Sequence, residues 1–362
     1  MKISLVTELF YPNIGGQEYR FYQFAKGLAR KNFEVNVYTS DYTNGELPSS
    51  EHIDGFTITR YIKLKNYIKP GSRNISPLVK YTIATSKLLG DLIEDSDAII
   101  INEMPIIHLF TLPRNKKVIV DWCEYYRYGF RKFILDSVAK RIDFSISVAE
   151  PIAEKVRRIN PRSKVQVIRT PLPIEKYIST SHKKDNELIL YIGRLVPHKN
   201  IINLAKALVI LNLKMGIKKR LVIAGEGPLK NTLLKMFSRY SFIEILGYVS
   251  EEKKIDLLNK AWLLAIPSLR EGLPNVVAEA IASTTPILTV NSPLNGTAEF
   301  VKLYKIGVIA SSGSPYDIAK AIASMNDGII EKIMIREKRL REEFKESRVI
   351  EELVTFLKLL EG

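Results

Sequence analysis

The sequence is poor in the features that mark secreted, membrane-spanning and metal-binding proteins. Its 362 residues include one cysteine, Cys123, which excludes an intrachain disulfide and favours a reducing compartment. No apolar run approaches the roughly 20 residues that a membrane-spanning helix needs. The N-terminal "MKISLVTELF" lacks a small-residue cleavage site and predicts a buried strand instead of a signal peptide. These three features predict a cytoplasmic protein. The four histidines show no paired ligand spacing, so we expect no metal.

Acidic residues are also scarce relative to basic ones. Lys and Arg number 54 against 39 Asp and Glu, which gives a formal net charge of +15. Such an excess favours an acidic partner, such as a nucleic acid, an anionic membrane or a phosphorylated ligand. The positive charge is present in both halves of the chain, and a generally basic solvated surface explains it equally well.

Short β-branched runs alternate with longer amphipathic segments along most of the chain, a pattern typical of βα units on a parallel sheet. The alternation stops in the Pro-, Ser- and Lys-rich stretch "RTPLPIEKYISTSHKKDN" and then begins again. We therefore predict an α/β protein of two doubly wound, Rossmann-like domains. The predicted parts are a first domain at 1–170, a linker at 171–185, a second domain at 186–340 and a terminal segment at 341–362. A long charged helix is predicted over 331–360.

The stretch "EGLPNVVAEA" places two carboxylates, Glu271 and Glu279, around the predicted start of a helix. Pro274 suits the first helical position because it lacks the N–H that would be unpaired there. The N–H groups of Asn275, Val276 and Val277 are expected to be free and to favour an anion. Carboxylates suit sugar hydroxyls and N–H groups suit phosphate, so the pattern predicts a nucleotide-sugar site.

Two further loops follow predicted strands, where open α/β sheets bind ligands. In "YIGRLVPHKN", Arg194 and Lys199 can clamp a diphosphate, although two solvated loop cations would give the same pattern. In "TELFYPNIGGQEYRF", Gly15 and Gly16 precede a predicted helix and allow close approach of a ligand. The glycines of "IAGEGPLKN" are compatible with a phosphate loop but are not specific to one.

Together these motifs resemble the retaining glycosyltransferases of family 4, which have the GT-B fold. The resemblance rests on "EGLPNVVAEAIA", with its two Glu separated by seven residues, and on "YIGRLVPHKN", "AGEGP", "GYVSEEKKIDLLNKA" and "GGQE" in the same order. It implies transfer of a sugar from a nucleoside diphosphate sugar to a hydroxyl acceptor, with no cofactor and no metal. It also implies that the last helix packs back on the first domain.

The resemblance implies a role for each donor-side residue. Glu271 would contact the transferred sugar and Glu279 the ribose, while Arg194 and Lys199 would hold the diphosphate. The backbone near Val249 would line the base. Gly16 would approach the diphosphate from the first domain, and the remaining donor contacts would come from the motif residues Gly272, Leu273, Pro274 and Asn275.

The first domain, which binds the acceptor in this family, departs from the family pattern. The family often has His residues where this chain has "INEMP", with Asn102 and Glu103, and "DWCEYY", with Cys123. These three residues are the acceptor-side candidates. Cys123 is expected to be a small buried residue more often than a nucleophile.

Other functions remain open at this point. A nucleotide-sugar epimerase or a glycogen-type elongating enzyme would share the fold. A non-catalytic nucleic-acid-binding protein would share the charge, but the recognition motifs of such proteins are absent, so no nucleic acid is expected. Basic and apolar residues interleave in "RYIKLKNYIKPGSR", with Lys63, Lys65 and Lys69, and in "RYGFRKFILDSVAKR". They predict an anionic membrane surface and a lipid-linked acceptor, or equally a guarded edge strand and an ordinary helix.

Overall fold

The structure is a computed structural model that describes all residues except 14, 44, 65–74, 125–128, 179–183 and 361–362, and the side chain of 131. The chain forms two compact units. Unit 1 consists of Met1–Pro171 together with Glu346–Gly362, and unit 2 consists of Leu172–Lys345. Unit 1 is therefore made from two separate stretches of sequence, whereas unit 2 is continuous. Among the described residues, no helix combines the length and the apolar character needed to cross a bilayer.

Unit 1 is built on an eight-stranded sheet in the order β3-β4-β2-β1-β5-β6-β7-β8. All neighbours pair in parallel except β3 and β4, which are antiparallel. The order reverses between β1 and β5, which is the point where such sheets place ligands. The strands are β1 (Lys2–Val6), β2 (Glu34–Asp41), β3 (Ser50–Ile53), β4 (Phe56–Lys63), β5 (Ala98–Asn102), β6 (Val118–Trp122), β7 (Phe144–Ser147) and β8 (Lys164–Val167).

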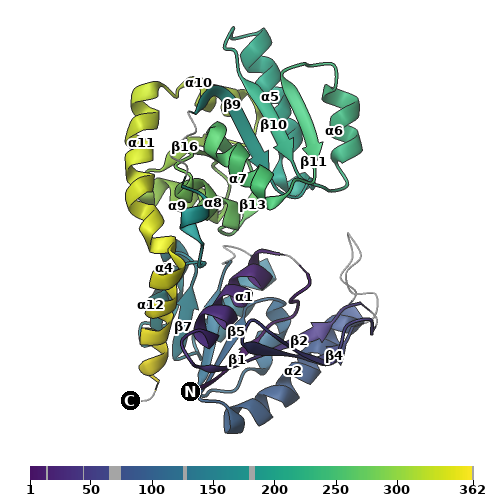
Figure 1. The fold of residues 1–362 in the computed structure, drawn as a ribbon, viewed down its shortest axis with the longest axis vertical. Helices are drawn as coiled ribbons and strands as arrows, with labels where there is room; N and C mark the ends of the chain where they lie inside the picture. The colour runs from purple at the N-terminus through teal and green to yellow at the C-terminus, as the bar shows by residue number, and fades with distance from the viewer. Residues whose placement is uncertain (14, 44, 65–74, 125–128, 179–183, 361–362) are drawn as a thin grey trace. The chain divides into compact units, whose positions relative to one another are not determined.

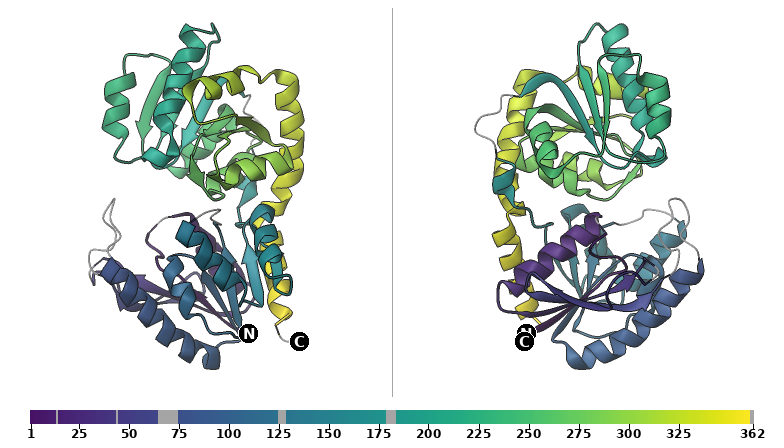
Figure 2. Two further views of the ribbon diagram at one scale, coloured as in Figure 1. Left: turned by 180° about the vertical axis from the view of Figure 1, so that it is seen from behind. Right: turned by 45° about the vertical axis from the view of Figure 1, so that its right-hand side comes forward.

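Helices cover both faces of this sheet (Figure 2). They are α1 (Gly16–Ala29), α2 (Ile75–Asp95), the 3-10 helix η1 (Ile106–Thr111), α3 (Gly129–Ala139), α4 (Glu150–Ile159) and the C-terminal α12 (Glu346–Lys358). α12 lies against α1, and its apolar side is part of the unit 1 core (Figure 1). Gly27 permits this packing, since a Cβ there would lie 2.4 Å from Cδ1 of Ile350.

Unit 2 has a parallel six-stranded sheet in the order β11-β10-β9-β12-β14-β16. Here the order reverses between β9 and β12. The strands are β9 (Asp185–Ile192), β10 (Arg220–Ala224), β11 (Ile243–Gly247), β12 (Ala261–Ile266), β14 (Ile287–Val290) and β16 (Gly307–Ala310). Two short strands, β13 (Arg270–Glu271) and β15 (Leu294–Asn295), pair with each other at the carboxyl edge of the main sheet.

The helices of unit 2 follow its strands as the βα pattern predicts. They are α5 (Ile201–Leu213), α6 (Lys230–Phe237), α7 (Glu251–Lys260), α8 (Asn275–Ala282), α9 (Gly296–Tyr304), α10 (Pro315–Ala323) and α11 (Asp327–Leu340), with 3-10 helices η2 (Ile174–Lys176), η3 (Pro197–Lys199) and η4 (Arg341–Phe344). Within the segment expected to be a linker, Ile174 and Tyr177 are buried in unit 2.

The prediction of one long helix over 331–360 was wrong. α11 ends at Leu340, η4 follows, and the chain is extended at Lys345 before α12 begins. Lys345 makes an isolated parallel bridge with Leu172, and the N–H of Leu172 donates to the carbonyl of Phe344 at 2.8 Å. These backbone pairs keep the chain non-helical at this point. One charged amphipathic sequence pattern therefore forms two helices that belong to different units. The sequence also gave no indication of β3, β13 and β15.

Candidate functional site

The donor-side residues predicted from sequence lie on unit 2 at the reversal of strand order. Arg194 follows β9, and the loop that ends in Glu271 follows β12, the neighbouring parallel strand. Because both strands point the same way, their carboxyl ends bring the basic loop and the acidic loop to one edge. Arg194 is exposed there, and its carbonyl accepts a hydrogen bond of 2.9 Å from the hydroxyl of Tyr191.

Lys199 and Glu271 form an ion pair between these two loops, through Nζ and Oε2. Both side chains are largely withdrawn from solvent, with 14% and 12% exposed. The hydroxyl of Ser268 donates to the same Oε2 at 3.2 Å. The structure thus brings together two residues predicted separately, one as a phosphate ligand and one as a sugar ligand.

The Glu271 loop is held by a segment that the sequence prediction missed. β13 and β15 pair Glu271 with Asn295, and the hydroxyl of Thr297 donates to the carbonyl of Gly272 at 3.0 Å. The buried side chain of Asn295 donates to Thr289 and to the carbonyl of Val290, each at 2.9 Å. The available signal was "NSPLNGTAE", a polar, Gly-containing stretch directly after a strand.

Glu279 lies inside α8 with only 8% of the residue exposed. Its Oε1 is 2.8 Å from Nζ of Lys254, which lies 2.8 Å from Glu251, and the hydroxyl of Tyr177 donates to Glu251 at 2.9 Å. Burial raises the pKa of Glu279, and Lys254 opposes that shift. The buried carboxylate is therefore already part of an ion-pair network within unit 2 that reaches the surface at Glu251.

The expectation that the Val277 N–H is free at the start of α8 was wrong. The helix begins at Asn275, with Pro274 as its N-cap residue. The N–H of Val277 donates to the carbonyl of Pro274 at 2.9 Å, which tightens the first turn. The Val277 N–H is therefore not available to bind an anion at this end of the helix.

The glycines of the "AGEGP" loop have a packing role. Gly225 and Gly227 have φ of +146° and +154°, and a Cβ on them would lie 1.9 Å and 2.5 Å from the carbonyls of Gly193 and Leu195. They allow the loop after β10 to lie directly on the Arg194 loop. Glu226, between them, accepts the N–H of Tyr248 at 3.1 Å and so fixes the backbone next to Val249.

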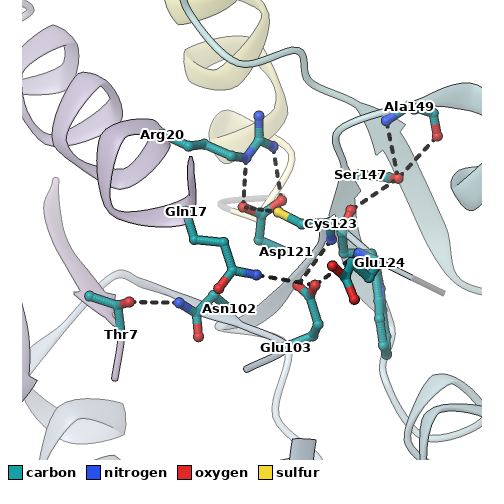
Figure 3. A network of polar contacts seen from close by, with 11 residues as sticks. Thr7, Gln17, Arg20, Asn102, Glu103, Asp121, Cys123, Glu124, Ser147 and Ala149 are labelled. Atoms are coloured by element: carbon teal, nitrogen blue, oxygen red, sulfur yellow. Dashed lines mark hydrogen bonds and ion pairs between the residues drawn. The ribbon is translucent and has the colours of Figure 1, made fainter. Parts of the chain in front are cut away.

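The acceptor-side candidates lie at the equivalent edge of unit 1, in a network of polar contacts (Figure 3). Glu103, directly after β5, is fully buried. It accepts the N–H of Cys123 at 2.9 Å, the N–H of Glu124 at 2.8 Å and the side-chain amide of Gln17 at 3.2 Å. Burial, with Asp121 nearby, raises the pKa of Glu103 well above its usual value.

Of the other two candidates, Cys123 is in this network and Asn102 forms a separate pair with Thr7 (Figure 3). Asn102 donates to Thr7 at 2.6 Å, and Cys123 is half-buried with its Sγ 3.8 Å from Asp121. Burial, reinforced by the nearby carboxylates, raises the pKa of the Cys123 thiol well above its usual value. A thiol that stays protonated is a poor nucleophile, which agrees with the prediction of a non-nucleophilic role.

The sequence prediction missed Arg20 and Asp121, which form a buried bidentate ion pair of 2.7 and 2.8 Å beside Cys123 (Figure 3). It also missed Gln17, which joins the first turn of α1 to Glu103. Gly16, the first residue of α1, is exposed beside it. No sequence pattern links these residues, because they lie on segments that are far apart along the chain.

The basic segments predicted to face a membrane are described only in part. Lys65, Lys69 and residues 125–128 lie outside the described residues, and Lys63 is exposed at the end of β4. The prediction that Arg60 faces a membrane was wrong. Arg60 is buried, pairs with Glu51 and donates to the carbonyl of Tyr11 at 2.9 Å. It is not available to a membrane.

Comparison with known proteins identifies the general class. Residues 174–342 match the family model described as glycosyl transferases group 1. This chain is a glycosyltransferase with the GT-B fold. An uncharacterized glycosyltransferase of Methanocaldococcus jannaschii is 25% identical over 90% of this chain and 88% of its own length. The sucrose-phosphate synthase of Thermosynechococcus elongatus has the same fold, with a TM-score of 0.79 over 99% of this chain and 98% of its own, at 16% identity.

The names of some relatives include an acceptor. A Campylobacter jejuni N-acetylgalactosaminyltransferase, whose name gives a diphospho-undecaprenol-linked acceptor, is 30% identical over 54% of each chain. The predicted fold and the predicted sugar-transferase function are thus confirmed.

Proposed function

We propose that the protein is a retaining glycosyltransferase of family 4 that uses a nucleoside diphosphate sugar. The observation that carries this proposal is the meeting of a basic loop and an acidic loop at the strand-order reversal of unit 2. Arg194 and Lys199 would bind the diphosphate, Glu271 the transferred sugar and Glu279 the ribose. The backbone at Val249 would line the base. The turn Gly272–Asn275 would complete the donor contacts.

In the proposed reaction the bond between the anomeric carbon and the diphosphate oxygen breaks while the acceptor oxygen attacks from the same face. The proton of the acceptor hydroxyl passes to the departing diphosphate oxygen, so the sugar keeps its anomeric configuration. Negative charge grows on the diphosphate as the bond breaks. The guanidinium of Arg194 and the ammonium of Lys199 would stabilise that charge.

Binding of the donor would change the partner of Lys199. Its ammonium now pairs with Glu271, and a diphosphate would compete with that carboxylate. Glu271 would then be released to accept hydrogen bonds from sugar hydroxyls, with Ser268 still holding Oε2. The ion pair would thus keep both side chains oriented until the donor binds. The diphosphate would then replace Glu271 as the partner of Lys199, and sugar hydroxyls would replace Lys199 as the partners of Glu271.

We propose that the reaction needs no metal. Two cations at the diphosphate supply the charge neutralisation that a divalent ion supplies in other transferases. Among the residues that the structure describes, no three His, Cys, Asp or Glu side chains gather closely enough to hold a metal ion.

For the acceptor we propose a lipid-linked hydroxyl compound bound by unit 1 at the cytoplasmic face of a membrane. Asn102 and Glu103 lie at the end of β5, at the strand-order reversal of that unit where a ligand is expected, and Cys123 follows the neighbouring strand β6. The diphospho-undecaprenol-linked acceptor of the Campylobacter jejuni relative supports this class of compound. Glu103 would act as a positioning residue, because all its described contacts fix neighbouring backbone and side chain.

Calorimetry with UDP, GDP and ADP tests the donor site. We expect Arg194→Ala and Lys199→Ala each to weaken binding of the preferred nucleotide by about 1.5–3 kcal/mol, the range for charged hydrogen bonds. Lys206→Ala, which removes an exposed cation of neighbouring α5, is the matched control and should bind like the wild type. Unchanged affinity in both site variants would refute the diphosphate clamp.

NMR of the product gives the anomeric configuration of the transferred sugar. Conversion of the donor sugar without an acceptor would indicate an epimerase.

A further inference from the structure

Unit 1 carries a large exposed apolar surface on three neighbouring elements. α2 and α3 both contact η1. Of the nine large hydrophobic side chains exposed in the described part of unit 1, only Tyr11 and Leu359 lie elsewhere. The other seven are Ile75, Val79 and Ile83 on α2, Ile107 and Phe110 on η1, and Phe130 and Phe133 on α3. We call these seven residues the apolar face.

The exposure of these residues follows from helical geometry. Ile75, Val79 and Ile83 recur every four residues and form one stripe on α2, opposite the buried Tyr81 and Leu92. Ile75 is 79% exposed and Phe130 is 71% exposed, so neither contributes to the core. Contiguous apolar patches on a soluble protein mark a binding surface.

The charges around the apolar face are mainly positive. On α2, Lys80 and Lys87 flank the stripe and are exposed, while the carboxylates Asp91, Glu94 and Asp95 occur only toward the other end of the helix. Beyond α3, Lys140 and Arg141 are exposed, and Arg141 donates to the carbonyl of Phe110 at 3.4 Å.

The described part of α3 has one acidic side chain, and a cation neutralises it. Asp136 pairs with Lys132 one turn earlier. The rim of the apolar face therefore has the charge that complements an anionic surface.

We infer that the apolar face docks on an anionic lipid bilayer. Exposed aliphatic and Phe side chains would enter the headgroup region while the surrounding lysines and Arg141 face anionic headgroups. A protein partner is a poorer match, because lysine is depleted at protein–protein interfaces and this rim contains several. The inference gives the lipid-linked acceptor of the proposed function a surface, and to that extent it rests on that function.

The position of the face supports this connection. η1 begins three residues after Glu103, so Ile107 lies close in sequence to the acceptor-side network. α2 runs from the carboxyl edge of the sheet back toward the start of β5. Its apolar stripe is in the half nearest that edge. A headgroup at a bilayer bound to this face would therefore lie near Glu103 and Cys123.

Sedimentation of the full chain with vesicles tests the docking. Wild-type protein should pellet with phosphatidylglycerol–phosphatidylcholine vesicles and much less with phosphatidylcholine alone. The double variant Ile83→Asp/Phe133→Asp should lose at least tenfold in partitioning. Leu213→Asp/Leu303→Asp, which changes two exposed side chains of unit 2, is the matched control and should pellet like the wild type. Lys80→Gln and Lys87→Gln should each reduce partitioning about fivefold.

A fluorescent variant reports insertion directly. Both natural tryptophans, Trp122 and Trp262, are buried, so they give a constant background. Phe133→Trp should shift its emission to the blue when anionic vesicles are added, and Leu213→Trp should not. Equal pelleting of the Ile83→Asp/Phe133→Asp variant and the wild type, or no pelleting of either, would overturn the inference.

Two further measurements separate this inference from its alternatives. Sedimentation velocity without lipid detects self-association, and a dimer that Phe133→Asp abolishes, without vesicle binding, would assign the face to a second copy and refute docking. Calorimetry with the nucleoside diphosphate should give wild-type affinity for the Ile83→Asp/Phe133→Asp variant. Loss of vesicle binding with intact nucleotide binding in this variant would therefore support docking through the apolar face. Absence of nucleotide binding in the wild type would refute the proposed function without testing the docking.

Discussion

Lys199 and Glu271 neutralise each other across two loops that follow the adjacent parallel strands β9 and β12. Neither residue is close to the other in sequence, and the pair exists because both strands end at the same edge of the sheet. Ser268 adds a hydrogen bond to the carboxylate from within its own loop. The ammonium and the carboxylate therefore orient each other before a donor binds.

This pair predicts opposite effects for the two residues on anion binding. Glu271→Gln should reduce sugar transfer on the order of 10²-fold, the cost of a misplaced reacting group. The same variant should bind the nucleoside diphosphate at least as tightly as the wild type, because Lys199 loses a competing carboxylate. Lys199→Ala should weaken that binding. Calorimetry and initial rates measure both properties, and weaker nucleotide binding by Glu271→Gln would contradict the competition between carboxylate and diphosphate.

Glu103 gives a prediction for the acceptor side. Glu103→Ala leaves the partly buried N–H groups of Cys123 and Glu124 without their acceptor, and each unpaired group costs up to about 1–3 kcal/mol. Glu103→Gln keeps one acceptor oxygen and should be less destabilising. We expect both variants to raise the KM for the acceptor while leaving nucleoside diphosphate affinity unchanged. Equal loss of nucleotide affinity would place Glu103 in general folding instead of acceptor positioning.

Glu337 gives a prediction for pH dependence. This residue of α11 is fully buried, and within the part of the chain that the structure describes neither carboxylate oxygen has a hydrogen-bond partner. Burial raises the pKa of Glu337 well above 4.5, against the opposing charge of Lys184. The folded protein therefore retains a proton that the unfolded chain releases, and stability falls as pH rises from about 4.5 through the folded pKa.

Glu337→Gln removes this dependence, so the difference in Tm between the variant and the wild type should grow in the variant's favour between pH 4.5 and pH 7. Thermal unfolding across that range measures it, and Glu331→Gln, at an exposed position of the same helix, is the control. A Tm difference that is constant with pH would mean that Glu337 titrates alike in the folded and unfolded chain.

The local pattern of the sequence was sufficient for the fold. Alternating β-branched runs and amphipathic segments predicted the main strands of both sheets, because buried parallel strands have a strong apolar signature. The same pattern failed at Lys345, where tertiary backbone pairing with Leu172 interrupts a helical periodicity. Local propensity carries no information about such a partner.

The candidate sites were predictable as loops but not as networks. Motif spacing placed Glu271 and Arg194 after their strands, as the structure does. It could not predict that Glu279 pairs with Lys254, or that Gln17 and Glu103 meet although they are 86 residues apart. These contacts depend on which strands become neighbours, and local sequence patterns do not reveal that order.

The adjacent backbone positions of Leu172 and Lys345 bear on how the protein is synthesised. Unit 2 is one uninterrupted stretch whose first and last residues are bridged, so it has the topology of a domain inserted into another. The ribosome makes all of unit 2 before it makes α12, which supplies Val349, Leu353 and Leu357 to the core of unit 1. Unit 1, although translated first, is therefore completed last, and a nascent chain must keep its incomplete core from aggregating while unit 2 forms.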